Sequence, residues 1–446
     1  MLVQPGSLLS CRRATRSGAL ALLGTETQGM AIALTDMSMV IRDTGTPANN
    51  FSGNPNSKLT YTAPSTKWIL GANGLYTSGT TLRTEYNTSG VAQGLRVEEA
   101  RTNLVLRSQE MDNAAWTKFA GTSVSANSTT SPDGTSNADR FVEINGGGSF
   151  HRLETTSAIT VSSGVAYTFS GFLKSSGRRY VHVRLDYGTI GGFCVDLNTG
   201  TITSGFYDGS NAAAALTSTS STALINGWYY VQGTFTTSTT AAFLYFYLSD
   251  SPTTTTFTGD GASGAYIWQV QLELGTFSTS PIVTTTASVT RAADDETLAS
   301  SLFPYSATNG TLYARFRLLS VAAEAIAVQL DDGTANERIN IGSTSGAAAQ
   351  LKVIDGGAAQ TAPLTTGAVT TSAFAKLAAS WKVNDFAASL DGAAAVTDVV
   401  GTLPTMTTLR LGSATGSATM LNGHLQALLY LPRDMSDAEL AVRSAS

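Results

Sequence analysis

The feature that most constrains the fold of this chain is an alternation of apolar and polar residues with a period of two. Successive side chains of a β-strand point to opposite faces, so this alternation predicts strands that are buried on one side. Turn pairs such as Asn-Gly and Asp-Gly separate the runs, as in a β-sandwich. The clearest runs cover residues 167–174, 179–186, 192–197, 228–235 and 243–248.

The composition agrees with a chain built from strands and turns. Only 13% of the 446 residues are charged and 42% are hydrophobic, while Thr, Ser, Gly and Ala are abundant. β-Branched Thr suits a half-exposed pleated surface, and Gly supplies the backbone angles that turns need. A chain of this length is expected to hold two or three cores. The predicted fold is all-β, with two β-sandwich (jelly-roll) domains in tandem and a small N-terminal β region.

Charge, the length of the apolar runs and the cysteine content argue against a nucleic-acid partner, membrane insertion and a disulfide framework. A net charge of −5 argues against nucleic acid, because phosphate binding depends on Lys and Arg. No apolar run reaches the roughly 18–20 residues that span a bilayer, so no membrane insertion is expected. The two cysteines, Cys11 and Cys194, give no disulfide framework. Cys194 lies in a strand-like run and is predicted to be a small buried hydrophobe.

Two motifs in the first half of the chain stand about one sandwich apart. Residues 94–116 read GLRVEEARTNLVLRSQEMDNAAW, and residues 259–275 read GDGASGAYIWQVQLELG, followed by VTRAAD at 289–294. In this order and spacing they resemble the carbohydrate-binding-like jelly-roll of bacteriophage head-fibre and tail-fibre (spike) proteins. The resemblance covers about residues 94–294. It implies a virion protein that is made in the host bacterial cytoplasm and displayed on the virion surface.

The last part of the chain predicts a second sandwich. Residues 310–446 hold further alternating runs and end in LNGHLQALLYLPRDMSDAEL, which resembles the closing strand and terminal helical turn of concanavalin-A/laminin-G-like domains. Ser436 and Glu439 form a capping-box pattern, which predicts a short helix starting there. Trp381 and Tyr430 are predicted to be core residues.

These observations divide the chain into four parts. Residues 1–29 differ from the rest and are predicted to be an extension or flexible anchor, with a secretion signal as the alternative. In the fibre proteins that the chain resembles, the region before the jelly-roll is a candidate for virion attachment and oligomerisation. The predicted parts are 1–29, 30–95 for attachment and oligomerisation, 96–290 for the jelly-roll, and 291–446 for the concanavalin-A/laminin-G-like sandwich.

A homo-oligomer is expected, with a trimer favoured. Trp68 and Tyr76 lie on short N-terminal strands and would be poorly buried in a monomer, so a contact between subunits would cover them. Linked copies would also multiply weak binding sites through effective concentration.

Signatures of catalysis are missing from the sequence. Residues 259–264 match G-x-G-x-x-G but run into a strand pattern rather than a helix, which predicts a turn and not a dinucleotide site. Asp260 in that turn is expected to be a plain turn residue, with a structural Ca²⁺ ligand as the alternative; no other cofactor is expected. Glu98 and Glu99 are adjacent carboxylates, but neighbours on one segment point apart. They are interpreted as structural charges, paired with Arg101 or Arg107.

A strand face is the better candidate for function. In 179–186 the aliphatic residues fall on one side and Tyr180, His182 and Arg184 on the other, so the polar and aromatic side is expected to face outward. Sugar sites combine aromatic planes with hydrogen-bonding groups. Tyr245 and Tyr247 lie in a run that is apolar on both faces, which predicts either a doubly covered strand or an aromatic platform.

The function predicted from the sequence is that of a non-enzymatic phage fibre or spike protein. Its expected partners are a host surface polysaccharide and other virion proteins of the capsid or tail. A polysaccharide depolymerase and a purely structural decoration protein are the two alternatives.

Overall fold

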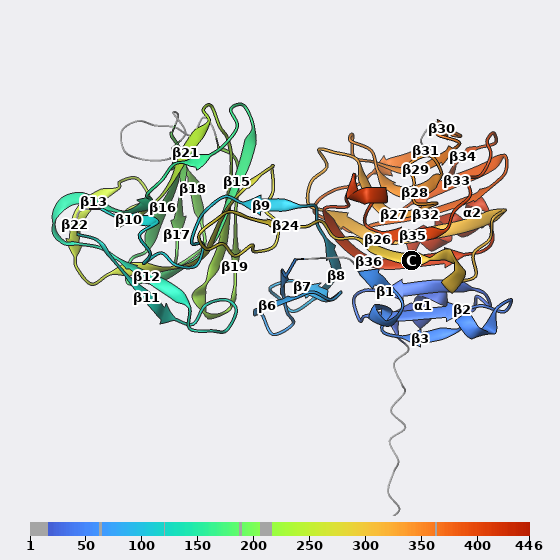
Figure 1. The fold of residues 1–446 in the computed structure, drawn as a ribbon, viewed down its shortest axis with the longest axis horizontal. Coiled ribbons are helices and arrows are strands. Elements are labelled where there is room, and N and C mark those ends of the chain that lie inside the picture. The colour runs from blue at the N-terminus through green and yellow to red at the C-terminus, as the bar shows by residue number, and fades with distance from the viewer. Residues whose placement is uncertain (1–16, 62–64, 120, 187–189, 206–215, 362–363) are drawn as a thin grey trace, which may run out of the picture.

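The computed structural model describes residues 17–446 except 62–64, 120, 187–189, 206–215 and 362–363. It has two β-sandwich lobes joined by a narrow region (Figure 1). The all-β prediction is confirmed: the lobes consist of antiparallel sheets, and the described helices of more than one turn are the short α1 (Gly18–Leu23) and α2 (Asp437–Ala445).

The first lobe is a sandwich of an 8-stranded and a 6-stranded sheet. Alternate residues of both sheets point inward and form one apolar core. The larger sheet contains β10 (Trp116–Lys118), β13 (Asn145–Thr155), β21 (Ala241–Ser249), β16 (Tyr180–Asp186), β17 (Ile190–Asp196), β18 (Ile202–Ser204), β14 (Ile159–Thr160) and β22 (Thr256–Asp260). The smaller sheet runs in the order β11 (Ser123–Thr129), β12 (Ala138–Val142), β23 (Gly264–Leu274), β15 (Ala166–Ser176), β20 (Tyr229–Thr236) and β19 (Leu216–Ala223).

The second lobe packs a 10-stranded sheet on an 8-stranded sheet. The first contains β3 (Phe51–Gly53), β2 (Ser38–Arg42), β1 (Gly29–Ala33), β36 (Gly423–Leu431), β26 (Asn309–Leu318), β32 (Ala375–Lys382), β33 (Asp385–Leu390), β34 (Val396–Asp398), β7 (Thr84–Tyr86) and β8 (Ala92–Val97). The second contains β30 (Ala358–Ala359), β29 (Ala348–Asp355), β28 (Arg338–Ser343), β27 (Ala325–Asp331), β35 (Thr408–Leu411), β25 (Glu296–Ala299), β4 (Thr60–Tyr61) and β31 (Leu364–Ala368).

Strands from the N-terminal region complete the second lobe. β1 pairs with β36, and β4 pairs with β25. All five positions of β1 are buried, because Met30 and Ile32 face the core between the sheets while Ala31 and Ala33 lie under α1 and its neighbours. Residues 29–61 are therefore built into the C-terminal sandwich in this structure. The attachment role assigned to this region stays a prediction.

The hairpin of β5 (Lys67–Leu70) and β6 (Tyr76–Gly79) contributes to a cluster with residues of the jelly-roll. Tyr76 is only 8% exposed, and the Trp68 ring meets Trp268 edge-on with centroids 6.1 Å apart. The expectation that both rings would be poorly buried in a monomer is wrong for Tyr76, while Trp68 is half-buried against the same cluster. The outer side of the jelly-roll sheet carries Phe172, Trp228 and Trp268, which cover these rings within one chain.

Several local predictions are confirmed. Trp381 and Tyr430 are fully buried, and so is Cys194, whereas Cys11 lies outside the described residues. The capping box at Ser436 and Glu439 starts α2.

Candidate functional site

The strand β16 has the two faces that its alternation predicts. Val181, Val183 and Leu185 are fully buried in the jelly-roll core. Arg184 and Tyr180, on the other face, are half-buried. Burial of the aliphatic side is what orients the polar side chains toward the outer surface of the larger sheet.

The outer surface of this sheet carries an aromatic row on β21, flanked by arginines. We call Phe243, Tyr245, Tyr247, Arg152 and Arg184 the aromatic face. Tyr245 and Tyr247 are stacked with centroids 6.1 Å apart, and Phe243 lies 6.4 Å from Tyr245. The Arg184 guanidinium lies 5.0 Å from the centre of the Tyr245 ring, and that of Arg152 lies 5.4 Å from it.

Strand register explains why these residues meet. Tyr245 is directly opposite Arg184 on one side and Glu154 on the other. Directly opposed residues of an antiparallel pair share a face, so the two flanking strands place their charges beside the same ring. Arg152 pairs with Glu154 at 2.6 Å and Arg184 with Asp186 at 2.7 Å, and these ion pairs hold both guanidinium groups in place.

The outward exposure expected for His182 is wrong. His182 is 0% exposed, and its Nε2 lies 3.2 Å from the carbonyl oxygen of Ser251. The segment after β21 passes over this position and excludes water. Burial lowers the pKa of His182 to about 4, so the imidazole is neutral at pH 7.

Tyr247 and Tyr180 are not freely exposed on the outer surface of the sheet either. Tyr247 is 1% exposed and meets the Phe150 ring edge-on at 5.7 Å, so its ring is covered and offers no free surface to a ligand. Tyr180 lies at the end of β16 under the Arg179 guanidinium, 4.9 Å from the ring centre. Within the aromatic face, the side chains that remain half-buried at the surface are Phe243, Tyr245, Arg152 and Arg184.

The turn at residues 259–264 joins β22 to β23, as predicted, and does not precede a helix. The Asp260 carboxylate accepts hydrogen bonds from the backbone amides of Ala262 and Ser263 and from the Ser263 hydroxyl. These bonds, led by those from Ser263, hold the pKa of Asp260 below its usual range. Its observed role is that of a turn residue. Among the described residues, no group of three or more His, Cys, Asp or Glu side chains is arranged to hold a metal ion.

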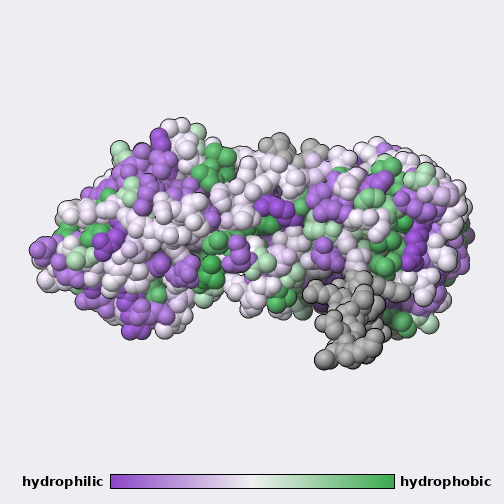
Figure 2. Space-filling view, turned by 90° about the horizontal axis from the view of Figure 1, so that it is seen from below, coloured by the Kyte–Doolittle hydropathy of each residue, from purple (hydrophilic) through white to green (hydrophobic). Residues whose placement is uncertain are grey.

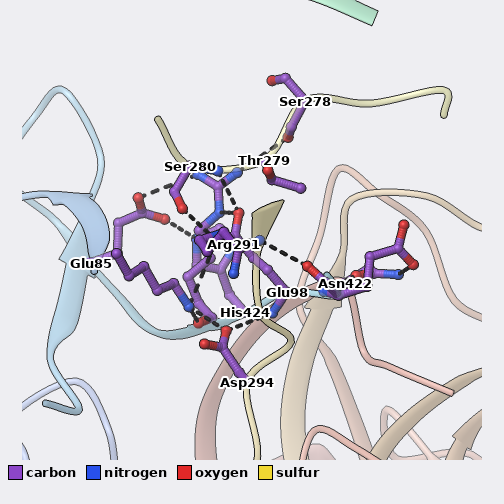
Figure 3. Close-up of polar contacts among 12 residues, drawn as sticks. Glu85, Glu98, Ser278, Thr279, Ser280, Arg291, Asp294, Asn422 and His424 are labelled. Atoms are coloured by element: carbon purple, nitrogen blue, oxygen red, sulfur yellow. Dashed lines mark hydrogen bonds and ion pairs between the residues drawn. The ribbon is translucent and has the colours of Figure 1, made fainter. Parts of the chain in front are cut away.

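The charged residues of the two sequence motifs meet at the junction between the lobes (Figure 3). The Glu98 carboxylate is fully buried and lies 2.6 Å from Arg96, 3.5 Å from Arg291 and 3.7 Å from Lys67. It also accepts hydrogen bonds from the amide and hydroxyl of Ser280. Burial alone would raise the pKa of Glu98, but the three cations outweigh burial, so the pKa lies well below its usual range.

A second buried carboxylate closes the junction. Asp294 pairs with Lys67 at 2.5 Å and accepts the backbone amide of Glu98 and the Tyr61 hydroxyl. We call Lys67, Arg96, Glu98, Arg291 and Asp294 the junction cluster. Alternate positive and negative groups from three separate segments satisfy one another there, which is what buried charges require.

Glu98 and Glu99 point apart, as expected of neighbours. Glu99 pairs with Arg101 at 2.5 Å, and its carboxylate also accepts a hydrogen bond from the Asn422 side chain of the C-terminal lobe. Arg107 pairs instead with Glu110. The interpretation of these glutamates as structural charges is confirmed. The partners of Glu98 come from both motifs and from Lys67, which the spacing did not reveal.

Next to the junction cluster lies an acid–imidazole pair from distant strands. His424 Nε2 is 2.6 Å from Glu85 Oε2, and the Arg317 guanidinium is 3.3 Å from His424 Nδ1. Burial alone would raise the pKa of Glu85, but Arg96 and His424 lower it to about 2. Nothing in the sequence around residues 85, 317 or 424 indicates this arrangement, because it depends on the pairing of β7, β8, β26 and β36.

Of the known proteins compared with this chain, only solved structures are similar to it. No protein-family model and no curated protein matches the chain. The CBM40 of the Ruminococcus gnavus IT-sialidase, bound to alpha2,3 sialyllactose, is 15% identical, with 31% of this chain and 84% of that chain covered and a TM-score of 0.28.

Two tandem-domain structures cover more of the chain. Domains LG4-5 of the mouse laminin alpha1 chain are 12% identical over 66% of this chain and 92% of that chain, with a TM-score of 0.22. The CBM22-1-CBM22-2 tandem domain of Paenibacillus barcinonensis Xyn10C is 9% identical over 75% of this chain and 97% of that chain, with a TM-score of 0.25. Similarities this low say nothing of what this chain binds.

Within the part of the chain that the structure describes, no helix has the length and apolar character needed to cross a membrane.

Proposed function

We propose that this protein is a non-enzymatic fibre or spike protein of a bacteriophage that binds a host surface polysaccharide. The observation that carries the binding proposal is the aromatic face. Half-buried Phe243 and Tyr245 offer flat apolar surface, and Arg152 and Arg184 beside them offer N–H donors. Sugars present an apolar ring face and a rim of hydroxyls, and this combination of groups is complementary to both.

The aromatic face lies on a rigid support. β21 lies between β13 and β16, and its other face is anchored in the core through the fully buried Leu244, Phe246 and Leu248. A rigid strand presents its side chains with little loss of entropy on binding. The phage context comes from the resemblance carried by residues 94–116 and 259–294.

Avidity is part of the proposal. A single shallow sugar site binds weakly, and linked copies raise the overall affinity through effective concentration. We propose a homo-oligomer, with a trimer favoured, attached to other virion proteins of the capsid or tail.

The test replaces the two half-buried aromatic residues of the face, Phe243 and Tyr245. We expect the Phe243→Ala/Tyr245→Ala variant to bind host cells and extracted surface polysaccharide severalfold more weakly, because it lacks the stacking surface. Each aromatic contact contributes on the order of 1 kcal/mol. The matched control is Tyr266→Ala, which removes a half-buried tyrosine from β23 in the other sheet of the same lobe. Circular dichroism and thermal unfolding would verify that both variants fold.

The outcomes separate the alternatives. Equal binding of the Phe243→Ala/Tyr245→Ala variant and the parent would place the sugar site elsewhere. Release of reducing ends from the polysaccharide would show a depolymerase. Absence of any binding by the parent, with normal adsorption of virions lacking the protein, would indicate a purely structural decoration protein.

A further inference from the structure

A cleft with a volume of about 430 Å³ opens beside the junction cluster. Its walls come from five segments of the chain that are far apart in sequence: residues 70–96, strands β19 and β20, residues 277–278, the end of β26, and His424 on β36. Clefts between domains are frequent sites of ligand binding. Figure 2, a view of the molecule from below, shows hydrophobic residues on the surface near the place where the two lobes meet, and others on the second lobe.

The charged side chains that line the cleft form ion pairs with one another or with the junction cluster, with one exception. Arg96 contacts two carboxylates, at 2.6 Å from Glu98 and 3.4 Å from Glu85. Glu85 is further satisfied by His424 at 2.6 Å. The Arg317 guanidinium, by contrast, forms no ion pair with any carboxylate of the described residues, and it lies 3.3 Å from His424 Nδ1.

The imidazole between Glu85 and Arg317 has a defined tautomer. A guanidinium has only donors, so His424 Nδ1 must accept from Arg317. The proton of the neutral ring is then on Nε2 and is donated to Glu85. This chain of bonds fixes the Arg317 side chain, as does the Phe374 ring 4.9 Å from its guanidinium carbon. One edge of the guanidinium is thus held, and its remaining N–H groups are available to the cleft that Arg317 lines.

The rest of the cleft suits a sugar. Tyr86, Tyr230 and Phe277 line it as half-buried aromatic side chains. Polar groups lie among them: the Tyr230 hydroxyl is 2.8 Å from Ser278 Oγ, which is 2.5 Å from Gln232 Oε1. Aromatic planes and hydroxyl or amide groups around one fixed cation are complementary to a ring that carries a carboxylate.

We propose that the cleft binds an acidic saccharide and that Arg317 receives the carboxylate of a uronic-acid residue. The planar guanidinium matches a carboxylate with two parallel hydrogen bonds, which a lysine cannot reproduce. The junction cluster fixes the two walls relative to each other, so the cleft is formed before the ligand arrives. This inference rests on the proposed glycan-binding function but assigns a second site and the chemical class of its ligand.

The experiment is isothermal titration calorimetry on the full chain with three probes: tetragalacturonate, the uncharged maltotetraose and glycerol 3-phosphate. We expect tetragalacturonate to bind the parent, maltotetraose to bind at least tenfold more weakly, and Arg317→Gln and Arg317→Lys each to weaken tetragalacturonate binding at least tenfold. Arg315→Gln is the matched control, because Arg315 also lies on β26 near Phe374 but is exposed and outside the cleft. Thermal unfolding would verify that the variants keep the fold.

Each outcome decides the inference. Failure of the parent to bind tetragalacturonate would overturn it, and so would equal binding of tetragalacturonate by Arg317→Gln and the parent. Tighter binding of glycerol 3-phosphate than of tetragalacturonate would also overturn it, because the group that Arg317 receives would then be a phosphate and not a sugar carboxylate. The Phe243→Ala/Tyr245→Ala variant keeps the cleft and should bind tetragalacturonate like the parent. If that variant loses cell binding while Arg317→Gln keeps cell binding and also binds tetragalacturonate like the parent, the glycan-binding proposal survives and the cleft proposal does not.

Discussion

The Glu98 carboxylate is buried among three cations from three segments of the chain, so its charge compensates several others at once. Removing one partner of a buried ionic cluster leaves the other charges without compensation, and this costs more than the loss of a surface pair. Glu98 belongs to the motif at residues 94–116. Its role is to join the two lobes rather than to contact a ligand.

We expect Glu98→Gln to lower the free energy of unfolding by about 3–5 kcal/mol, because Arg96, Lys67 and Arg291 would stay buried with one anion fewer. Urea unfolding monitored by tryptophan fluorescence measures this loss. The matched control is Glu99→Gln: the Glu99 side chain is 36% exposed, and the expected loss is within about 1 kcal/mol. Equal losses in the two variants would contradict a buried ionic role for Glu98.

The buried imidazole of His182 predicts a pH dependence. Its pKa is about 4 in the folded chain against 6.5 for the free side chain. Between these values the unfolded chain binds the additional proton, so the stability that His182 contributes is complete above about pH 6.5 and falls as the pH falls toward 4. We expect His182→Gln to reduce the slope of stability against pH in this window. An unchanged slope would show that His182 is solvated or protonated in the folded lobe.

At the scale of one element, β16 presents a core face and a surface face. Val183 lies opposite Phe193 and Phe246 in the neighbouring strands and is fully buried, whereas Arg184 next to it faces outward. Adjacent positions on this strand therefore tolerate very different chemistry.

We expect Val183→Asp to prevent folding of the jelly-roll, because the carboxylate would be buried without a partner. Arg184→Ala, one residue further on, should leave the lobe folded and lower its stability by about 1 kcal/mol or less, since it removes a partly exposed ion pair. Near-ultraviolet circular dichroism and limited proteolysis distinguish these outcomes. A folded Val183→Asp variant would contradict the assignment of this face to the core.

At the scale of the whole molecule, the two sandwiches are joined by more than a single linker. β9 (Arg101–Asn103) pairs with β24 (Val289–Arg291), while β8 pairs with β36 of the C-terminal sheet. The chain enters and leaves the jelly-roll through this pair of strands (Figure 1). The junction cluster lies beside them, and it fixes the cleft between the lobes.

The proposed trimer is tested by light scattering on the purified chain. We expect a mass of about three times 46.3 kDa. Tyr76 is buried and Trp68 is half-buried against Trp268 within one chain, which removes one reason for a subunit contact, so the expectation now rests on avidity. A mass of one chain at all concentrations would contradict it, and the avidity would then come from many copies on one particle.

The sequence by itself determined what depends on local stereochemistry. The period of two placed Val181, Val183 and Leu185 on the core side of a strand, because side chains alternate along an extended backbone. The turn at 259–264 and the capping box at Ser436 were predictable for the same reason: their hydrogen bonds connect residues within a few positions.

Only the tertiary structure decided which distant segments meet. β1 completes a sheet with β36, almost the whole length of the chain away, and His182 is covered by the segment that follows another strand. Alternation shows that a face is apolar or polar but carries no information on what packs against it. The junction cluster and the Glu85, His424 and Arg317 arrangement depend on such long-range pairing, so their charged residues were visible in the sequence while their partners were not.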